Sequence, residues 1–238
     1  MAELKGRDKQ QYVSEMFARI SERYDLMNTL MTGGLHLRWK EKTARLTAGG
    51  LTGKALDVAT GTGDLAFSLA RCPGIDGAVG VDLLPQMISL AREKARAKDL
   101  EHKTTFLLGD AHALPFPDNS FACATAGFSL RNMSNLDRAL AEMVRVVRPG
   151  GRVSTLELTP MRPGGLAALM RIYTQGLVPI LGKLVARDRA AYTYLPQSVD
   201  HFLDAGTLAG RFQNVGLTGV SYRRLGFGAV TLHWGDKP

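Results

Sequence analysis

The segment A-L-D-V-A-T-G-T-G-D-L-A, residues 55–66, joins a short apolar run to two glycines and the start of a helix-like stretch. Gly61, Gly63 and Ala66 fit the G-x-G-x-x-G/A pattern, in which a glycine turn between a strand and a helix lets the backbone approach a nucleotide. Asp82 follows 19 residues after Gly63, near the position where that pattern places a carboxylate for a ribose. The segment therefore predicts an α/β fold with a nucleotide-type site.

Strand-like and helix-like segments alternate along the chain after this turn. Further apolar runs typical of strands occur at 78–83, 105–110, 121–128 and 152–158. Asn135 is placed to cap a helix, and we expect the Pro-Gly-Gly segment at 149–151 to stop it. Residues 220–234 are typical of a closing β-hairpin around two glycines. The alternation predicts a Rossmann-like domain with a doubly wound, parallel sheet.

The N-terminal part has a different pattern. Apolar residues with charges between them recur at helical spacing over 13–20. Residues 1–50 therefore predict a helical cap, and residues 51–238 the Rossmann-like domain. Within that domain, an apolar stretch interrupted by glycine and proline predicts a helical insertion at about 160–200.

Length and composition suit one α/β domain with additions, since the chain has 238 residues, 45% of them hydrophobic and 22% charged. Cys72 and Cys123 lie far apart and form no CxxC or Cys/His pattern, so we expect no disulfide framework and no metal site. The first 25 residues lack the apolar core of a signal peptide, and the longest uncharged stretch, 172–182, is too short to span a bilayer. These features predict a cytoplasmic protein.

The charge balance is basic, because 30 Lys and Arg exceed 22 Asp and Glu by 8. Such a surplus is compatible with an anionic membrane surface, nucleic acid or an acidic substrate. The basic residues are scattered, and the segment after the fourth predicted strand, A-G-F-S-L-R-N, is not the [DN]-P-P-[YF] clamp typical of nucleic-acid amino-methyltransferases. We therefore expect no nucleic-acid partner.

Carboxylates surround the glycine turn, and they argue against a dinucleotide. Asp57 precedes the turn and Asp64 follows it, where a pyrophosphate would approach the helix N-terminus. Two like charges about 4 Å apart cost on the order of 4 kcal/mol at an effective dielectric constant of 20. S-adenosylmethionine suits this environment better, because it has no phosphate and carries a sulfonium and an ammonium group.

If S-adenosylmethionine is the cofactor, residues at each expected strand end have a predicted contact with it. We expect Asp57 to face the methionine ammonium, directly or through water. Gly61, Thr62 and Gly63 are expected to let the backbone approach the methionine carboxylate. Asp82 is expected to bind the ribose hydroxyls, and Asp110 with the Ala111 amide to read the adenine edge.

Two longer stretches resemble a specific family. Residues 24–39, Y-D-L-M-N-T-L-M-T-G-G-L-H-L-R-W, and 145–158, R-V-V-R-P-G-G-R-V-S-T-L-E-L, are similar to both signature segments of the ubiquinone/menaquinone biosynthesis C-methyltransferases. The segments at 114–121, 128–132, 192–199 and 232–235 also resemble that family. The departures are conservative: Ala59 replaces a frequent first glycine of the turn, and Thr32 and Thr159 replace common serines.

The resemblance implies a class I methyltransferase fold, with a mostly parallel seven-stranded sheet and an antiparallel last strand. It implies S-adenosylmethionine-dependent C-methylation of a polyprenylated quinol, with demethylmenaquinol as the first choice and a polyprenyl benzoquinol as the alternative. A small-molecule or RNA methyltransferase and a non-catalytic binding protein stay open as other functions. A lipid substrate further implies that the protein contacts the anionic inner face of the membrane as a peripheral protein. A homodimer is also left open.

Ring-carbon methylation needs a group that deprotonates or polarises the neighbouring hydroxyl. Arg131 is the first candidate for that role, with Asn132 fixing its geometry, although a purely structural arginine is the simpler alternative. His36 and Tyr24 are further candidates, as a base or as hydrogen-bond donors, and each could equally be a packing residue.

Overall fold

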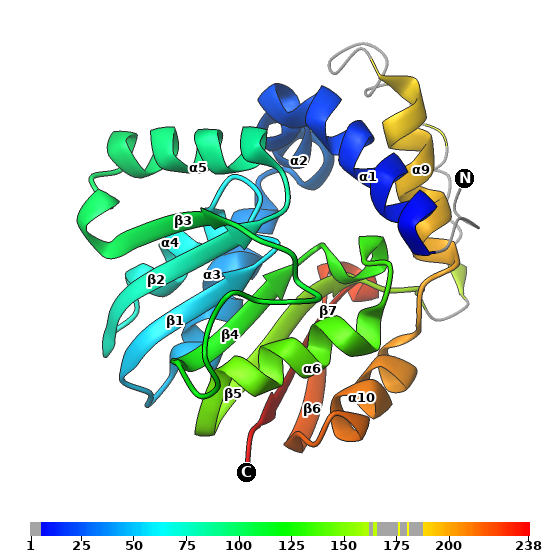
Figure 1. The fold of residues 1–238 in the computed structure, drawn as a ribbon. Coiled ribbons are helices and arrows are strands. Elements are labelled where there is room, and N and C mark those ends of the chain that lie inside the picture. The colour runs from blue at the N-terminus through cyan, green and yellow to red at the C-terminus, as the bar shows by residue number, and fades with distance from the viewer. Residues whose placement is uncertain (1–5, 162–163, 166–175, 177–179, 181–187) are drawn as a thin grey trace.

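The structure is a computed structural model in which residues 6–161, 164–165, 176, 180 and 188–238 are described. These residues form one seven-stranded sheet in the order β3-β2-β1-β4-β5-β7-β6 (Figure 1). The strands are β1 (Gly53–Val58), β2 (Ile75–Asp82), β3 (Thr104–Leu108), β4 (Phe121–Gly127), β5 (Val147–Leu158), β6 (Thr218–Leu225) and β7 (Val230–Asp236).

All strands except β7 run in one direction. β1 pairs in parallel with β2 and β4, β2 with β3, and β4 with β5, whereas β7 is antiparallel to both β5 and β6. The expected mostly parallel sheet with an antiparallel last strand is confirmed, as is the closing hairpin. Because parallel strands end at the same edge, the segments that follow β1, β2, β3 and β4 are brought together there.

Helices cover both faces of the sheet (Figure 1). On one face lie α3 (Leu35–Ala48), α4 (Asp64–Ala70) and α5 (Pro85–Ala97), and on the other α6 (Leu136–Val146) and α10 (Ala205–Asn214). Side chains alternate along a strand, so Leu56 packs toward α6 and α10 while Ala55 packs toward α3 and α4. Full burial of a leucine such as Leu56 stabilises the fold by roughly 1.5–3 kcal/mol.

Three further helices form a layer over the carboxyl edge of the sheet. They are α1 (Gly6–Ile20), α2 (Tyr24–Thr32) and α9 (Arg189–Asp200), which share one apolar cluster containing Met16, Met27 and Tyr194 (Figure 1). Helix α3, although within the first 50 residues, packs on the sheet beside α4. The insertion expected at about 160–200 lies largely outside the described residues, apart from α9. None of the helices within the described ranges is both long and apolar enough to cross a membrane.

The Pro-Gly-Gly segment does not act as the predicted helix stop, and that expectation was wrong. Helix α6 starts after the predicted cap Asn135, whose side chain accepts a hydrogen bond from the Arg138 amide, but it ends at Val146. Strand β5 starts at the next residue and runs through the segment. A Cβ on Gly151 would lie 2.4 Å from the carbonyl oxygen of Ala122 on β4, so the glycine permits the close approach of the two strands.

Candidate functional site

The turn after β1 has the backbone conformation that its glycines allow. Gly61 and Gly63 have φ values of 56° and 87°, and Ala59 also adopts a positive φ of 52°. Below the turn lies Asp57, which accepts hydrogen bonds from the hydroxyls of Thr60 at 2.6 Å and Thr125 at 2.8 Å. Both carboxylate oxygens of Asp57 therefore hold the turn and the neighbouring strand β4 in place.

Asp57 lies buried below the cavity above the turn and is not part of its lining. Burial raises the pKa of Asp57 to about 6, against the opposing effect of the hydrogen bonds from Thr60 and Thr125. The geometry supports a positioning role for this carboxylate, with the turn between it and the cavity.

Asp82, at the end of β2, lines the cavity and is fixed by backbone amides. Its carboxylate accepts hydrogen bonds from the Gly61 amide at 2.8 Å and from the Leu84 amide at 3.0 Å. Burial raises the pKa of Asp82, although these amide hydrogen bonds lower it in part. Asp82 thus ties the glycine turn to β2 and keeps a carboxylate at the cavity wall.

Asp110 and Ala111 follow β3 and line the same cavity. Asp110 accepts hydrogen bonds from the backbone amide of His112 at 2.9 Å and from Gln10 at 3.3 Å, and the His112 ring nitrogen Nδ1 lies 2.6 Å from it. Burial alone would raise the pKa of Asp110, but the hydrogen bonds from His112 outweigh it and lower the pKa. The carboxylate is therefore ionised at neutral pH.

The lining of this cavity tests the cofactor. Asp82 and Asp110 are its carboxylates, and none of the described residues in its lining is lysine or arginine. Such a wall disfavours a pyrophosphate and suits the positively charged S-adenosylmethionine. Ser129, which the sequence did not single out, adds a buried hydroxyl without a hydrogen-bond partner in the described part of the chain. The residues present therefore fit S-adenosylmethionine, with Asp82, Asp110, Ala111, Gly61 and Ser129 placed to hold it.

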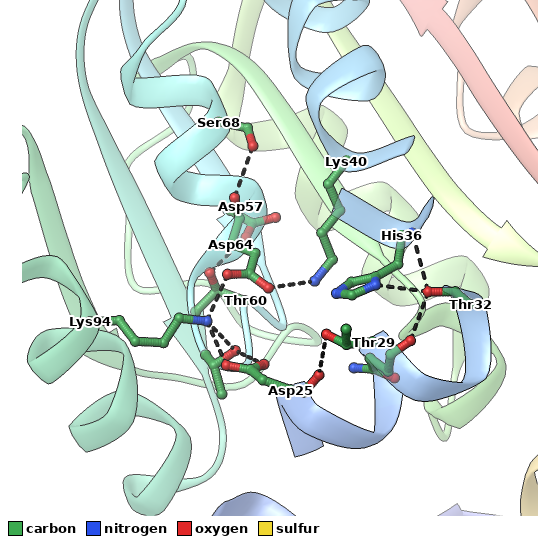
Figure 2. Close-up of polar contacts among 12 residues, drawn as sticks. Asp25, Thr29, Thr32, His36, Lys40, Asp57, Thr60, Asp64, Ser68 and Lys94 are labelled. Carbon is green, nitrogen blue, oxygen red and sulfur yellow. Dashed lines mark hydrogen bonds and ion pairs between the residues drawn. The ribbon is translucent and has the colours of Figure 1, made fainter. Parts of the chain in front are cut away.

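Thr62 and Asp64 belong to a polar network beside the cavity and do not line it. Figure 2 shows Asp64 of this network between Lys40 and Lys94. The Thr62 hydroxyl donates to Asp25 on α2 at 2.7 Å, and Lys94 on α5 contacts Asp25 at 2.7 Å and Asp64 at 2.6 Å. Lys40 on α3 forms an ion pair with the other oxygen of Asp64 at 3.1 Å. The network joins α2, α3 and α5 to the glycine turn.

These ion pairs change the argument against a dinucleotide. Burial would raise the pKa of Asp64, but Lys40 and Lys94 outweigh it and lower the pKa to about 2. Asp64 is thus a neutralised partner of two lysines, and the repulsion expected from it does not act on the cavity. The argument rests instead on Asp82, Asp110 and the absence of basic residues from the described lining.

A second, larger cavity of about 380 Å³ adjoins the first and is mostly apolar. Phe17, Tyr24 and Phe128 line both cavities and form the wall between them. The apolar cavity is further bounded by side chains of α1, α2, α3, α9 and the turn between β6 and β7. Arg131 and His36, the two predicted catalytic residues, both line it.

Thr32 sets the proton position on His36. The Thr32 hydroxyl donates to the Asn28 carbonyl oxygen at 2.7 Å, so its contact of 2.9 Å with Nδ1 of His36 requires the ring to donate (Figure 2). We therefore assign the proton to Nδ1 and leave Nε2 as a hydrogen-bond acceptor. Burial first, and then the charge of Lys40, lower the pKa of His36 to about 4, so the ring is neutral at pH 7.

Arg131, in the short turn after β4, is held on several sides. Its Nη1 donates to Glu157 and to the Phe128 carbonyl oxygen at 2.6 and 2.7 Å, and its Nε to the Ser198 hydroxyl at 3.2 Å. Both partners of the Arg131–Glu157 pair are buried, with side-chain exposures of 6% and 0%. These hydrogen bonds use Nε and Nη1, and within the described part of the chain no partner is found for Nη2, so Nη2 is available to a ligand in the apolar cavity that Arg131 lines.

Sequence reasoning missed the partners that hold these groups. Lys40, Lys94 and Asp25 come from three different helices, and Glu157 from a distant strand. Their spacing carries no pattern, because the contacts form only when the chain folds. Only Glu157 and Asp25 lay inside segments already singled out by their resemblance to the family signatures.

Comparison with known proteins agrees with this geometry. Residues 5–237 match the model of the ubiE/COQ5 methyltransferase family. The chain is 41% identical over 231 residues to a ubiquinone/menaquinone biosynthesis C-methyltransferase, UbiE, of Dinoroseobacter shibae, covering 97% of this chain and 92% of the relative. It is 42% identical over 224 residues to a demethylmenaquinone methyltransferase of Thermus thermophilus, covering 94% of this chain and 100% of the relative.

Solved structures share the fold at much lower identity. The [4+2]-cyclase SpnF superposes with a TM-score of 0.71 at 20% identity, covering 97% of each chain. An S-adenosylmethionine-dependent methyltransferase of Thermotoga maritima superposes with a TM-score of 0.64 at 19% identity, covering 94% of this chain and 99% of that one. Since one is named a cyclase and the other a methyltransferase, these likenesses establish the fold alone.

Proposed function

The chain belongs to the ubiE/COQ5 methyltransferase family and is an S-adenosylmethionine-dependent C-methyltransferase, and from this premise we propose that it methylates the ring of demethylmenaquinol to give menaquinol. The observation that carries the proposal is the apolar cavity that shares a wall with the carboxylate-lined cavity. An apolar ring with a prenyl tail needs such a cavity, and the shared wall brings its carbon close to the cofactor side.

When bound, S-adenosylmethionine supplies an electrophilic methyl group, and the residues of this chain prepare the ring that receives it. Arg131 is proposed to donate a hydrogen bond from Nη2 to a ring oxygen, while Glu157 holds the guanidinium in place. A positive donor at this oxygen stabilises negative charge there and makes the neighbouring ring carbon more nucleophilic.

His36 is proposed as a hydrogen-bonding group rather than as the final proton acceptor. Its pKa is lowered to about 4 by burial and Lys40. Taking a proton from a phenol of ordinary pKa about 10 would then cost about 8 kcal/mol. Neutral His36 with an unprotonated Nε2 can accept a hydrogen bond from a hydroxyl without taking its proton.

The choice of demethylmenaquinol follows the names of two relatives. Demethylmenaquinone methyltransferases of Thermus thermophilus and Deinococcus radiodurans are 42% and 43% identical to the chain. The UbiE relative of Dinoroseobacter shibae, at 41%, is named for both quinones, so a polyprenyl benzoquinol is the second candidate.

A direct assay separates these substrates. The purified protein is incubated with S-adenosylmethionine bearing a deuterated methyl group and with a short-chain demethylmenaquinol or the matching benzoquinol, each kept reduced. We expect mass spectrometry to find the labelled methyl on the naphthoquinol ring, and Asp82→Ala to abolish the product. If only the benzoquinol is labelled, the substrate is a benzoquinol and not demethylmenaquinol. If neither compound is labelled, the proposal is refuted.

We further propose that the chain takes this lipid substrate from an anionic membrane surface. Leu35 on α3 and Phe227 in the turn between β6 and β7 line the apolar cavity and are 38% and 77% exposed. Leu26 and Leu30 on α2 and Leu37 on α3 are 45–52% exposed. These five side chains form what we call the leucine rim. The net charge of +8 favours an anionic surface.

Co-sedimentation with phosphatidylglycerol vesicles tests the leucine rim. Phe227→Ser is expected to weaken binding about tenfold, because an apolar side chain loses its burial in the lipid. Leu108→Ser, at a position that is 54% exposed at the end of β3, is the matched control and should bind as the wild type does. Equal loss in both variants would contradict the assignment.

A further inference from the structure

Tyr192 has a buried hydroxyl that the structure leaves unused. It lies on α9, lines the apolar cavity and is 4% exposed. Its hydroxyl has no hydrogen-bond partner within the described part of the chain. Because a buried hydroxyl without a partner lowers stability, its presence here calls for an explanation in terms of a ligand.

The unpartnered atoms elsewhere in the described ranges make Tyr192 distinctive. The other buried side-chain atoms without a partner belong to Ser129, Ser154, Thr155, Arg224 and His233. Of these residues, Ser129 alone lines one of the two cavities described above, and it is on the cofactor side. Tyr192 is therefore the counterpart of Ser129 on the substrate side.

Its neighbour on the helix shows the contrast. Tyr194 lines the same cavity and is equally buried, but its hydroxyl donates to the Asn132 side-chain oxygen at 3.3 Å. Burial, with smaller contributions from Tyr24 and Asp188, raises the pKa of Tyr192 well above its ordinary value. The Tyr192 hydroxyl therefore keeps its proton and lacks only an acceptor.

We propose that the Tyr192 hydroxyl donates a hydrogen bond to the second ring oxygen of the quinol and is a specificity-determining residue of the apolar cavity. This inference rests on the proposed function, in which Arg131 contacts the first ring oxygen. A quinol carries two oxygens on opposite sides of its ring, and a mostly apolar cavity must satisfy both to bind it well. Tyr192 supplies a donor for the oxygen that Arg131 does not contact, and the hydroxyl at that oxygen can still donate to an acceptor such as His36.

The test pairs one substitution with one change of ligand. Dissociation constants of wild type and Tyr192→Phe are measured for a short-chain prenyl naphthoquinol and for its analogue lacking the second oxygen. We expect Tyr192→Phe to weaken quinol binding about tenfold, which corresponds to about 1.4 kcal/mol. It should leave binding of the one-oxygen analogue within twofold, and the melting temperature of the ligand-free protein should stay equal or rise.

Other results would overturn the assignment of Tyr192 or the proposed function. Equal weakening for both ligands means that the ring only packs against the substrate, and unchanged quinol binding means that the hydroxyl is not used; either overturns the assignment. A wild-type chain that binds neither compound overturns the proposed function, and the assignment of Tyr192 with it.

Discussion

Removing the Arg131 side chain is expected to lower the free energy of unfolding, whatever its effect on catalysis. Arg131→Met leaves the Glu157 carboxylate, which is fully buried, without its partner at 2.6 Å. Breaking one side of a buried ion pair costs about 3–5 kcal/mol, a large share of the roughly 5–15 kcal/mol that stabilises a typical domain. We therefore expect urea denaturation to show a loss of about 3 kcal/mol or more in the free energy of unfolding.

A double variant isolates the cause of this loss. Adding Glu157→Gln removes the unpaired charge while an amide oxygen remains to accept from the Leu158 amide, a bond of 2.8 Å, so we expect about 2 kcal/mol to be regained. Arg211→Met is the matched control, because its pair with Asp137 is exposed and should cost less than about 1 kcal/mol. Equal losses for Arg131→Met and Arg211→Met, or no recovery in the double variant, would refute the reasoning.

Three further predictions concern the turn and the polar network. Ala59→Gly should raise the unfolding free energy by about 1 kcal/mol in urea, because a positive φ of 52° is strained for alanine; a loss would contradict this. Thr32→Val should shift the imidazole proton of His36 away from Nδ1 in nitrogen-15 spectra, whereas Thr32→Ser should retain it, and identical spectra for all three proteins would disprove the tautomer assignment. Asp64 has a folded pKa of about 2 against an ordinary 3.8, so its stabilisation of roughly 2 kcal/mol is complete above pH 4 and lost as the pH falls to 2; Asp64→Asn should remove this acid-induced loss, as measured by melting temperature.

Local patterns were enough to predict most of the fold. The glycine turn at 55–66, the cap at Asn135 and the alternation of strands and helices depend on neighbours in the sequence, and the structure contains each of them. The Pro-Gly-Gly segment was misread because its conformation depends on β4, a strand more than 20 residues away, against which Gly151 packs. Local chemistry alone favoured a helix stop there.

The sequence was enough to predict which strand-end residues lie near one another, but not which side chains contact them. Asp82, Asp110 and Ala111 line one cavity at the carboxyl edge of the sheet, where the topology of a parallel sheet brings strand ends together. Asp57 and Thr62 lie beside the turn rather than in the cavity wall, because whether a side chain points up or down at a strand end depends on packing from β4 and α2. No spacing rule could reveal these contacts.

Phe128, in the wall between the two cavities, shows which substitutions this wall tolerates. Phe128 keeps a positive φ of 57°, a conformation that costs a non-glycine residue about 1–3 kcal/mol. Its amide donates to the Leu156 carbonyl oxygen, and its own carbonyl accepts from Arg131 at 2.7 Å. A glycine at 128 would relieve that strain but would also remove the ring, which packs against the cluster of Leu156, Val230 and Leu232 and lines both cavities. Because truncating a packed phenylalanine costs about 3–5 kcal/mol, more than this strain, a search for greater thermal stability would retain Phe128 and with it the wall that the two cavities share.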